Sequence, residues 1–419
     1  MRFIYNLALS FYHLALFIAH FFNKKAKLRV EGLLGQEKNI KSRLKEFGEK
    51  PLFWMHVSSL GEFEQGRPLV EAFRKQHPEW VILISFYSAS GYEVRKLYPG
   101  ADVVCYLPND SPKQAREFVD LIKPSLVVWV KYDFWLNYLT YLVGSDKPIF
   151  LISSVFRENK YPFNWLGKKL MMPVFSAFKG LYVQDEASLK VANRHGLERV
   201  WVSGDTRIDR VLDNKRNRGM LAQRLQDYAG AHPKIMVLGS VWPRDLEVVL
   251  PFIKAHPEWS FILAPHEITA RFVSKIEASL PNQCLCFTKM RDVETTSFPN
   301  FNVLILDTIG QLASAYDLAS MAYIGGGFNK GIHNTLEPAV FGIPVFFGPH
   351  YHKFNEAIDF IELGVAQSVE STNQLEAAFQ HFNTIEQLEK TETLLNGYFN
   401  AKKGATQKIM THLNTFLEQ

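Results

Sequence analysis

The sequence is poor in cysteine and lacks the compact motifs that usually mark metal sites, ATP sites and nucleophilic catalysis. Only three cysteines occur among 419 residues. Cys105, Cys284 and Cys286 are too few for a disulfide framework and do not give the paired CxxC spacing of a zinc site. No Asp-x-Asp, HExxH, GxSxG or Gly-Lys-Ser/Thr is present, so metal-dependent chemistry, serine hydrolysis and P-loop ATP hydrolysis lose support. We expect a protein of a reducing compartment, without a metal ion or another cofactor.

The sequence also lacks a long segment with charges of one sign. Lys and Arg number 47 against 42 Asp and Glu, which gives a formal net charge of +5, and the basic residues form no long arm. Nucleic acid is therefore not an expected partner. Aromatic residues, in contrast, make up 14% of the chain and include 33 Phe, more than a small core requires. We expect part of this aromatic surface to meet lipid or a ligand.

The N-terminus carries a long apolar run, FIYNLALSFYHLALFIAHFF, which precedes NKKAKLR. About 20 apolar residues suffice to cross a bilayer, but Asn6, Ser10, His13 and His20 interrupt the run, and an interfacial helix in the headgroup region fits nearly as well. A cleaved signal peptide is disfavoured because the basic residues follow the apolar run and no A-x-A-like site is present. We expect residues 1–28 to form a membrane anchor helix, with the basic cluster holding the following chain on the cytoplasmic side.

Short apolar runs rich in Val, Ile and Phe recur along the rest of the chain, each followed by a polar turn and a helical pattern. This arrangement is typical of parallel strands buried on both faces. One series runs from PLFWMHV to VWVSGD, and a second begins again at KIMVLGSVW. The sequence predicts an α/β protein with two doubly wound Rossmann-like domains: an N-terminal domain over 29–212, a linker over 213–232, and a C-terminal domain with terminal helices over 233–419. Ligands bind such domains at the carboxyl ends of the strands, so the cleft between the domains is the expected site.

The stretch HVSSLGEFEQ begins at the end of an expected strand and continues into a helix. Ser59 and Glu62 match the capping box, in which the serine hydroxyl accepts from the amide of the glutamate and the carboxylate accepts from the amide of the serine. That structural role is one interpretation. Gly61, however, is a poor helix former in a first turn, and Ser-Ser-x-Gly after a strand leaves amides free at the ligand edge. In the second interpretation the Glu62 carboxylate acts there as a general base.

The stretch AYIGGGFNKGIHNTLEPAVFG has the character of a phosphate site. Gly326 and Gly327 belong to a run of three glycines that lets the backbone approach a ligand closely, and Asn334 or Thr335 can cap the helix that follows. The amides and the dipole at the helix start favour a phosphate. The Glu337 carboxylate could accept from both hydroxyls of a ribose, or could simply lie favourably near a helix N-terminus.

Neighbouring turns are expected to reach the same edge of the second sheet. They are LGSVWPRD with Ser240, APHEITARF with His266, and LDTIGQL with Ile309, Gly310 and Gln311. As a group they are candidates for contacts with a phosphate or a base. Taken singly, each is more ordinary as a loop or capping residue, and His266 as a satisfied polar residue at a strand end.

The segment VFRENKYPFNWLGKKLMMPVFSAFKG mixes basic residues with Phe, Trp, Leu and Met. It is consistent with an amphipathic helix against the sheet whose lysines stay in water. Alternatively, Arg157, Lys168 and Lys169 meet anionic lipid headgroups and admit a lipid substrate. The expected N-terminal anchor favours that second interpretation.

Five stretches, taken in order, resemble the Kdo transferases, which add 3-deoxy-D-manno-oct-2-ulosonic acid (Kdo) to the lipid A precursor. They are WMHVSSLGEFEQGRPLVEAF, VSGDTRIDRV, LGSVWPRDLE, LDTIGQLASAYDLASMAYIGGGF and GIHNTLEPAVFGIPVFFGPHYHKFNE. The resemblance extends from about Arg29 to Gly364. It implies a GT-B architecture, CMP-Kdo as donor, the lipid A precursor as acceptor, a tether to the cytoplasmic side of the inner membrane, and inversion at the anomeric carbon without a metal ion.

The resemblance also implies roles for the residues named above. Glu62 would be the general base, with Ser59 and Gly61 beside it toward the donor. The contacts with the rest of CMP-Kdo would come from Ser240, His266, Ile309, Gly310, Gln311, Gly326, Gly327, Asn334, Thr335 and Glu337, of which Asn334 and Glu337 would meet the phosphate and the ribose.

The chain also departs from the family pattern. Lys131 and Asp133, in VKYDFWLN, stand where the family commonly has Glu-Thr-Glu, Gln311 replaces a Glu, and Ile332 replaces a Gly. We expect altered acceptor or donor details and the same reaction. The expected acceptor or membrane surface consists of Lys131, Arg157, Lys168 and Lys169.

Two other functions are compatible with the same patterns. One is a GT-B enzyme that uses a UDP-sugar, as a transferase or an epimerase. The other is a membrane-tethered nucleotide-binding protein without turnover.

Overall fold

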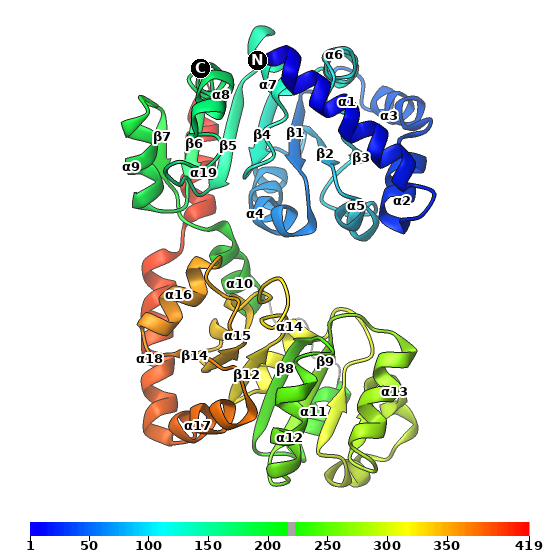
Figure 1. Cartoon of the computed structure of the whole chain (residues 1–419), viewed down its shortest axis with the longest axis vertical. Coiled ribbons are helices and arrows are strands. Elements are labelled where there is room, and N and C mark those ends of the chain that lie inside the picture. Colours follow the sequence, from blue (N-terminus) through cyan, green and yellow to red (C-terminus); the bar gives the residue numbers. More distant parts are fainter. Residues whose placement is uncertain (217–222, 419) are drawn as a thin grey trace. The chain divides into compact units, whose positions relative to one another are not determined.

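The computed structural model describes residues 1–216 and 223–418. The chain forms two compact units, one of Met1–Asp209 with Lys402–Gln419 and the other of Arg210–Ala401. Each unit contains one parallel seven-stranded sheet with helices around it (Figure 1). The predicted α/β class with two Rossmann-like domains is thus confirmed.

The sheet of the first unit has the strand order β3-β2-β1-β4-β5-β6-β7. Its strands are β1 (Leu52–Val57), β2 (Val81–Phe86), β3 (Val103–Tyr106), β4 (Leu126–Val130), β5 (Ile149–Ser154), β6 (Gly180–Val183) and β7 (Val200–Val202). The helices along this part of the chain are α1 (Arg2–Ala19), α2 (Lys24–Leu33), α3 (Gln36–Lys45), α4 (Leu60–Gln76), α5 (Ala89–Arg95), α6 (Pro112–Ile122), α7 (Leu136–Gly144), α8 (Trp165–Phe175), α9 (Glu186–Arg194) and α10 (Thr206–Arg216).

The first sheet is buried on both faces, as its continuous apolar strands require. In β1, Trp54 belongs to the core on one face, whereas its neighbours Phe53 and Met55 belong to the core on the other. Successive side chains of a strand point to opposite faces. An uninterrupted apolar run therefore fits a strand that is covered by helices on both sides.

The sheet of the second unit has the order β10-β11-β9-β8-β12-β13-β14. Its strands are β8 (Ile235–Val241), β9 (Ser260–Pro265), β10 (Cys284–Cys286), β11 (Val303–Ile305), β12 (Met321–Ile324), β13 (Val345–Phe347) and β14 (Ala366–Ser368). The α-helices are α11 (Gln223–Gly230), α12 (Leu246–Ala255), α13 (Ala270–Ser279), α14 (Leu312–Ala315), α15 (Leu336–Ala339), α16 (Asn355–Glu362), α17 (Thr372–Phe382) and α18 (Ile385–Lys402), and short 3-10 helices span Phe287–Asp292, Thr295–Asn300 and Tyr316–Leu318.

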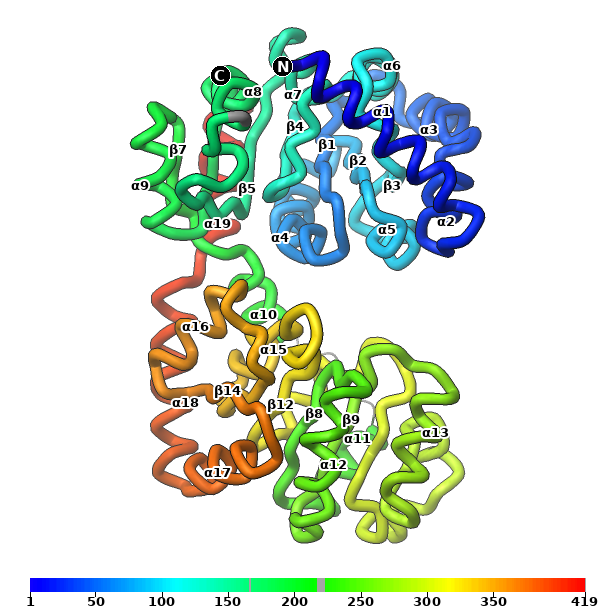
Figure 2. Tube along the Cα trace, in the orientation of Figure 1, coloured from blue at the N-terminus to red at the C-terminus, as the bar shows by residue number. Residues whose placement is uncertain are grey.

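The last helix, α19 (Ala405–Leu417), packs in the first unit, as the red end of the trace in Figure 2 shows. Ile409, Met410 and Leu413 lie in the core that contains β1 and α4. The Phe416 ring meets the Phe150 ring of β5 edge to face at 5.4 Å. The sequence-based boundary, which placed all of 233–419 in the second domain, is corrected here for 402–419. Amphipathic periodicity shows that a helix has a buried face, but it does not show which sheet supplies the partner.

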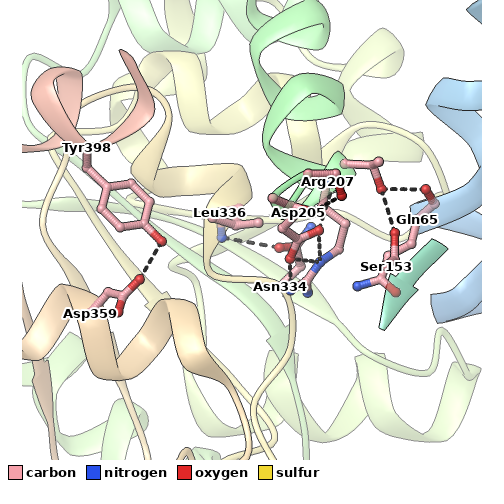
Figure 3. A network of polar contacts seen from close by, with 11 residues as sticks. Gln65, Ser153, Asp205, Arg207, Asn334, Leu336, Asp359 and Tyr398 are labelled. Carbon is pink, nitrogen blue, oxygen red and sulfur yellow. Dashed lines mark hydrogen bonds and ion pairs between the residues drawn. The ribbon is translucent and has the colours of Figure 1, made fainter. Parts of the chain in front are cut away.

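The predicted linker, 213–232, includes residues 217–222, which lie outside the described residues. On either side of them the chain is helical, in α10 and α11. The C-terminal half of the second unit is joined by side-chain contacts as well as by the sheet. The Tyr398 hydroxyl of α18, for example, donates to Asp359 of α16 at 2.9 Å (Figure 3).

Helix α1 rests on the first unit through polar contacts. The Tyr5 hydroxyl donates to Asp110 at 2.6 Å, and Asn137 at the start of α7 donates to Asn6 at 2.9 Å. None of its residues is fully buried. Among the described residues α1 is the one helix long and apolar enough to cross a membrane. Many of its large apolar side chains are exposed, among them Phe3, Ile4, Leu7, Phe11, Leu14, Phe17 and Ile18.

We predict that shortening Leu413 destabilises the first unit alone. Leu413 is fully buried between α19 and the β1–α4 core, so Leu413→Ala should lower the free energy of unfolding by about 2–5 kcal/mol. Hydrogen exchange should rise in α4 and β1 and stay unchanged in α18. Thr415→Ala, exposed on the same helix, is the matched control. Faster exchange in the second unit would contradict the assignment of α19.

Candidate active site

The candidate residues follow the strands at which each sheet changes its winding direction. In the first sheet β1 lies between β2 and β4, and in the second β8 lies between β9 and β12. Crossovers on the two sides of such a point run in opposite directions, which leaves a crevice beyond the carboxyl ends of the two central strands. Glu62 follows β1 and Lys131 follows β4, while Ser240 is the next-to-last residue of β8 and the glycine run follows β12. Both units thus present candidate residues where doubly wound folds bind ligands.

Glu62 forms the predicted capping box at the start of α4. The Ser59 hydroxyl accepts from the Glu62 amide at 3.4 Å, and Glu62 Oε2 accepts from the amides of Ser58 and Ser59 at 2.5 and 3.0 Å. Both backbone bonds use Oε2, and no described residue donates to Oε1. Capping therefore engages one carboxylate oxygen and leaves the other to act on a substrate. The two interpretations of this stretch are compatible.

The pKa of the Glu62 carboxyl is raised to about 7. Burial is the main cause, because it disfavours the charged form, and the negative charge of Asp133 adds to it. The amides of Ser58 and Ser59 and the positive charge of Lys131 act in the opposite direction. A carboxyl poised near neutral pH is suited to general base catalysis, because it is partly ionised and still a competent proton acceptor.

Further charged groups lie at the same edge of the first sheet. Lys131 has a positive φ of 60° and interacts electrostatically with both Glu62 and Asp205. Asp205, after β7, accepts from Arg207 Nε at 3.0 Å and from Arg207 Nη2 at 2.6 Å (Figure 3). Burial opposes ionisation of Asp205, but Arg207 holds the pKa of this carboxyl below its usual value. Asp205 is therefore ionised, and this edge carries both signs of charge.

The remaining basic candidates lie at different places. Arg157 follows β5 and interacts electrostatically with Tyr132, the neighbour of Lys131, so Arg157 and Lys131 share one edge. Lys168 and Lys169 are exposed on α8. The contacts place neither lysine beside Glu62, and the expected acceptor or membrane surface stays a prediction for them.

In the second unit, one buried carboxylate that we did not single out from the sequence organises the candidate site. Asp245 accepts from the Trp242 amide at 2.7 Å, from the Gly326 amide at 3.0 Å and from the Tyr323 hydroxyl at 2.8 Å. These donors belong to the turn after β8, the turn after β12 and the strand β12. Asp245 therefore ties the two turns that flank the winding change to each other.

The glycine run leaves no room for side chains. A Cβ on Gly325 would lie 2.3 Å from the Ser240 carbonyl oxygen, and a Cβ on Gly327 would lie 2.6 Å from the backbone of Gly348. Gly326 has a φ of 94° and Ser240 one of 54°, conformations that L side chains rarely adopt. The glycines are thus required by close packing of the backbone. Their predicted contact with a donor stays a prediction.

The helix expected in HNTLEPAVFG is present but short. Helix α15 is a single turn, Leu336–Ala339. Asn334 makes the capping contact, because its Oδ1 accepts from the Leu336 amide at 3.2 Å (Figure 3). Its amide nitrogen donates to Glu337 Oε1 at 3.1 Å, whereas Thr335 makes no side-chain capping bond. One turn supplies free amides but little macrodipole, so any anion here would depend mainly on direct hydrogen bonds.

A pocket of about 520 Å³ adjoins these turns. Trp242 and His266 line it together with Arg271, Phe272 and Lys275 of α13. Its volume lies within the usual range for small-molecule sites, and the two cations favour an anionic ligand. Sequence reasoning found His266 but missed Trp242, Arg271 and Lys275. The signal for the two cations was their spacing by four residues on a helix that follows His266.

The third turn predicted for this site is open to solvent. The Ile309 side chain is 93% exposed, an unusual state for an isoleucine and therefore compatible with a ligand contact. Gly310 has a φ of 98°, and Gln311 directly precedes α14 without a side-chain capping bond. The turn therefore exposes backbone amides, as a ligand contact requires, but no contact in the structure tests that role.

Comparison with known proteins agrees with this arrangement. Residues 36–210 match the family described as 3-deoxy-D-manno-octulosonic-acid transferase (kdotransferase). This part of the chain is similar to the Kdo transferases. It contains Glu62 together with Lys131, Asp133 and Asp205.

Proteins described as Kdo transferases are similar to most of the chain. The 3-deoxy-D-manno-octulosonic acid transferase of Chlamydophila psittaci is 28% identical over 335 residues, which are 78% of this chain and 76% of that protein. The enzyme of the same description from Aquifex aeolicus is 26% identical over 324 residues, 75% of this chain and 80% of its own length. The chain is thus a relative of glycosyltransferases over both of its units.

Solved structures confirm the fold. The UDP-GlcNAc 2-epimerase from Neisseria meningitidis, bound to UDP-GlcNAc, superposes with a TM-score of 0.58 at 14% identity, over 87% of this chain and 100% of that one. At this level of identity the likeness concerns the fold alone. It agrees with the predicted GT-B class.

We predict that two neighbours move the pKa of Glu62 in opposite directions. Lys131→Gln removes a positive charge that lowers this pKa, so the pKa should rise. Asp133→Asn removes a negative charge that raises it, so the pKa should fall. Each shift should be about half a unit or more, because solvent screens the interactions only in part. Carbon-13 NMR titration of the Glu62 carboxyl measures both.

The control for this pair is Lys169→Gln, which removes an equal charge from the exposed face of α8 and should leave the Glu62 titration unchanged. Shifts of the same sign in Lys131→Gln and Asp133→Asn would show that these variants act through a change in fold and not through charge.

Proposed function

We propose that the chain is an inverting, metal-independent glycosyltransferase that transfers Kdo from CMP-Kdo to the lipid A precursor, in lipopolysaccharide biosynthesis at the cytoplasmic side of the inner membrane. The observation that carries the proposal is the Glu62 carboxyl, which lies in the family-matched part of the chain, has a free oxygen and has a pKa of about 7. The names of the curated relatives support the choice of sugar.

In the proposed reaction a hydroxyl oxygen of the acceptor attacks the anomeric carbon of Kdo. The bond from that carbon to the phosphate oxygen breaks, and CMP leaves with the electron pair. Glu62 Oε1 takes the hydroxyl proton as the new carbon–oxygen bond forms. A direct displacement of this kind inverts the anomeric configuration. The Ser58 and Ser59 amides hold the carboxylate in place through Oε2, and Ser59 and Gly61 are proposed to lie toward the donor.

The proposed donor contacts come from the second unit. Asn334 would meet the phosphate and Glu337 the ribose hydroxyls, supported by Ser240, Thr335 and the glycines Gly326 and Gly327. The pocket beside His266 and the exposed turn of Ile309, Gly310 and Gln311 are proposed for the remainder of CMP. What supports this assignment is that Ser240, the glycines and the 334–337 turn follow β8 and β12, the two strands at the winding change of the second sheet, and that His266 and the Ile309 turn follow β9 and β11 of the same parallel sheet. Arg271 and Lys275 add positive charge beside that pocket.

The proposed acceptor is anionic and lipid-linked, which agrees with the first unit. Lys131 and Arg157 lie at the edge that carries Glu62. Helix α1 exposes a row of large apolar side chains, which suits a membrane surface, and Lys168 and Lys169 are proposed to meet headgroups nearby.

We predict that Glu62→Gln lowers turnover by about 10² to 10⁴-fold, because a general base contributes about that factor. The affinity for CMP should be retained, because the amide oxygen still accepts the backbone bonds. Product formation from CMP-Kdo and the lipid A precursor, followed by mass spectrometry with EDTA present, measures the effect. The control is Glu64→Gln, which removes a carboxylate of the same helix that pairs with Arg95. Undiminished product formation by Glu62→Gln would contradict the role of Glu62 as the general base. If the unaltered protein forms no product, the proposed transferase activity is wrong.

We predict that Glu337→Gln weakens CMP by about tenfold or more, because hydrogen bonds to a charged group are worth about 1.5–3 kcal/mol. Isothermal titration calorimetry of CMP and UDP measures this, and the unaltered protein should prefer CMP. Glu362→Gln, an exposed carboxylate of α16, is the control. A preference for UDP would favour the alternative UDP-sugar enzyme, and unchanged CMP affinity would exclude Glu337 from the ribose site.

A further inference from the structure

Three aromatic side chains of the second unit form a two-layer stack at the candidate donor site. Trp242 and His333 lie side by side, with ring planes only 10° apart and centroids 6.2 Å apart. Their edges are joined by a hydrogen bond of 2.8 Å between Trp242 Nε1 and His333 Nε2. The His266 ring covers both, with centroids 4.2 Å from Trp242 and 4.3 Å from His333.

The hydrogen bond determines which nitrogen of His333 carries its proton. The indole nitrogen of tryptophan can only donate. His333 Nε2 must therefore be the acceptor, and a neutral imidazole then carries its proton on Nδ1. The ring is neutral at physiological pH, because burial and the neighbouring His266 lower the pKa of His333 to about 4. The result is a histidine with one defined donor, Nδ1–H.

The position of this donor is also fixed. His333 is held by its own amide, which donates to the Gly325 carbonyl at 3.2 Å, and by the His266 ring above it. A Cβ on Gly326 would lie 2.7 Å from the Gly331 carbonyl oxygen and 3.1 Å from His333 Cδ2, so a larger residue at 326 would displace the backbone or the ring. No residue in the described parts of the chain accepts from Nδ1, and the side chain is only half-buried. The Nδ1–H group of His333, the residue that precedes Asn334 in the sequence, is therefore a donor with a fixed position and no acceptor among the described residues.

We propose that Trp242 is a positioning residue, which holds His333 with its Nδ1–H directed at an anionic phosphate oxygen of the bound nucleotide donor. The contact between Nδ1–H and a phosphate rests on the proposed CMP-Kdo donor. The selection of the His333 tautomer by Trp242 does not depend on that proposal. A neutral donor in a fixed place binds a phosphate oxygen without a cation that would have to be desolvated, and it loses little entropy on binding. Phe at 242 would keep the stacking and lose the N–H that selects the tautomer.

Nitrogen-15 NMR of histidine-labelled protein without ligand tests the tautomer. We expect a pyrrole-type signal from His333 Nδ1 and a pyridine-type signal from Nε2. In Trp242→Phe the two nitrogens should show averaged signals, because nothing then selects one tautomer. A proton on Nε2 in the unaltered protein, or an unchanged tautomer in Trp242→Phe, would overturn the role of Trp242.

Binding of CMP and of cytidine, which lacks the phosphate, tests the ligand. We expect Trp242→Phe to weaken CMP by about tenfold, the effect of one hydrogen bond to a charged oxygen, and to leave cytidine unchanged. Two variants of His333 distinguish the contributions of its Nδ1 and Nε2 atoms to CMP binding while Trp242 stays unchanged. His333→Gln places an acceptor near the Nε2 position and lacks the Nδ1 donor, so it should lose as much CMP affinity. His333→Asn places an amide near the Nδ1 position and should keep more of it.

The outcomes distinguish this inference from the donor assignment on which it rests. Equal losses of CMP and cytidine affinity in Trp242→Phe would show that the stack serves the base or the fold, and would overturn the phosphate contact. Unchanged CMP affinity in both Trp242→Phe and His333→Gln would also overturn the phosphate contact. If the unaltered protein binds neither CMP nor CMP-Kdo, the proposed donor fails together with this contact, while the tautomer found by NMR still decides the role of Trp242.

Discussion

The chemistry proposed for this chain depends on one carboxylate that is partly withdrawn from water and yet held by two backbone amides. Burial and Asp133 favour the neutral form of Glu62, and the amides of Ser58 and Ser59 together with Lys131 favour the charged form. Burial prevails and raises the pKa of Glu62 to about 7, so the neutral and charged forms are about equally populated at neutral pH. The capping box that begins α4 is therefore part of the same arrangement: it orients the carboxyl group and partly offsets the cost of charging it.

The second unit uses a carboxylate in a different way. Asp245 is completely buried, and burial raises the pKa of its carboxyl group while three donors oppose that rise. Its role is to join the turn after β8 to the glycine turn after β12. Trp242 and His333 lie on those two turns, so their coplanar pairing depends on Asp245 even though it touches neither ring. The two units thus have the same type of fold and candidate sites at the same place in it. Their central acids differ in role, because Glu62 is the proposed base and Asp245 joins two turns.

Much of the fold and part of the candidate site could be predicted from local pattern. Apolar runs identify buried parallel strands, and Ser59 with Glu62 carries a capping signal within four residues. What the sequence could not show depends on partners far away in the chain. The surface that buries α19 is set by Ile409 and Leu413 meeting β1 and α4, and the tautomer of His333 is set by a tryptophan 91 positions earlier.

The Asp209 carboxylate joins the two chain segments that make up the first unit. Asp209 is the last residue of that unit before the chain leaves it, and its oxygens accept from the amides of Gly404 and Thr406, just after the chain returns. The points of exit and re-entry are thereby bridged by a single side chain. The first unit is accordingly a continuous body into which the second is inserted, and its cut ends are near enough for a short peptide to close them. A module inserted at such a position can be exchanged in evolution without unravelling its host.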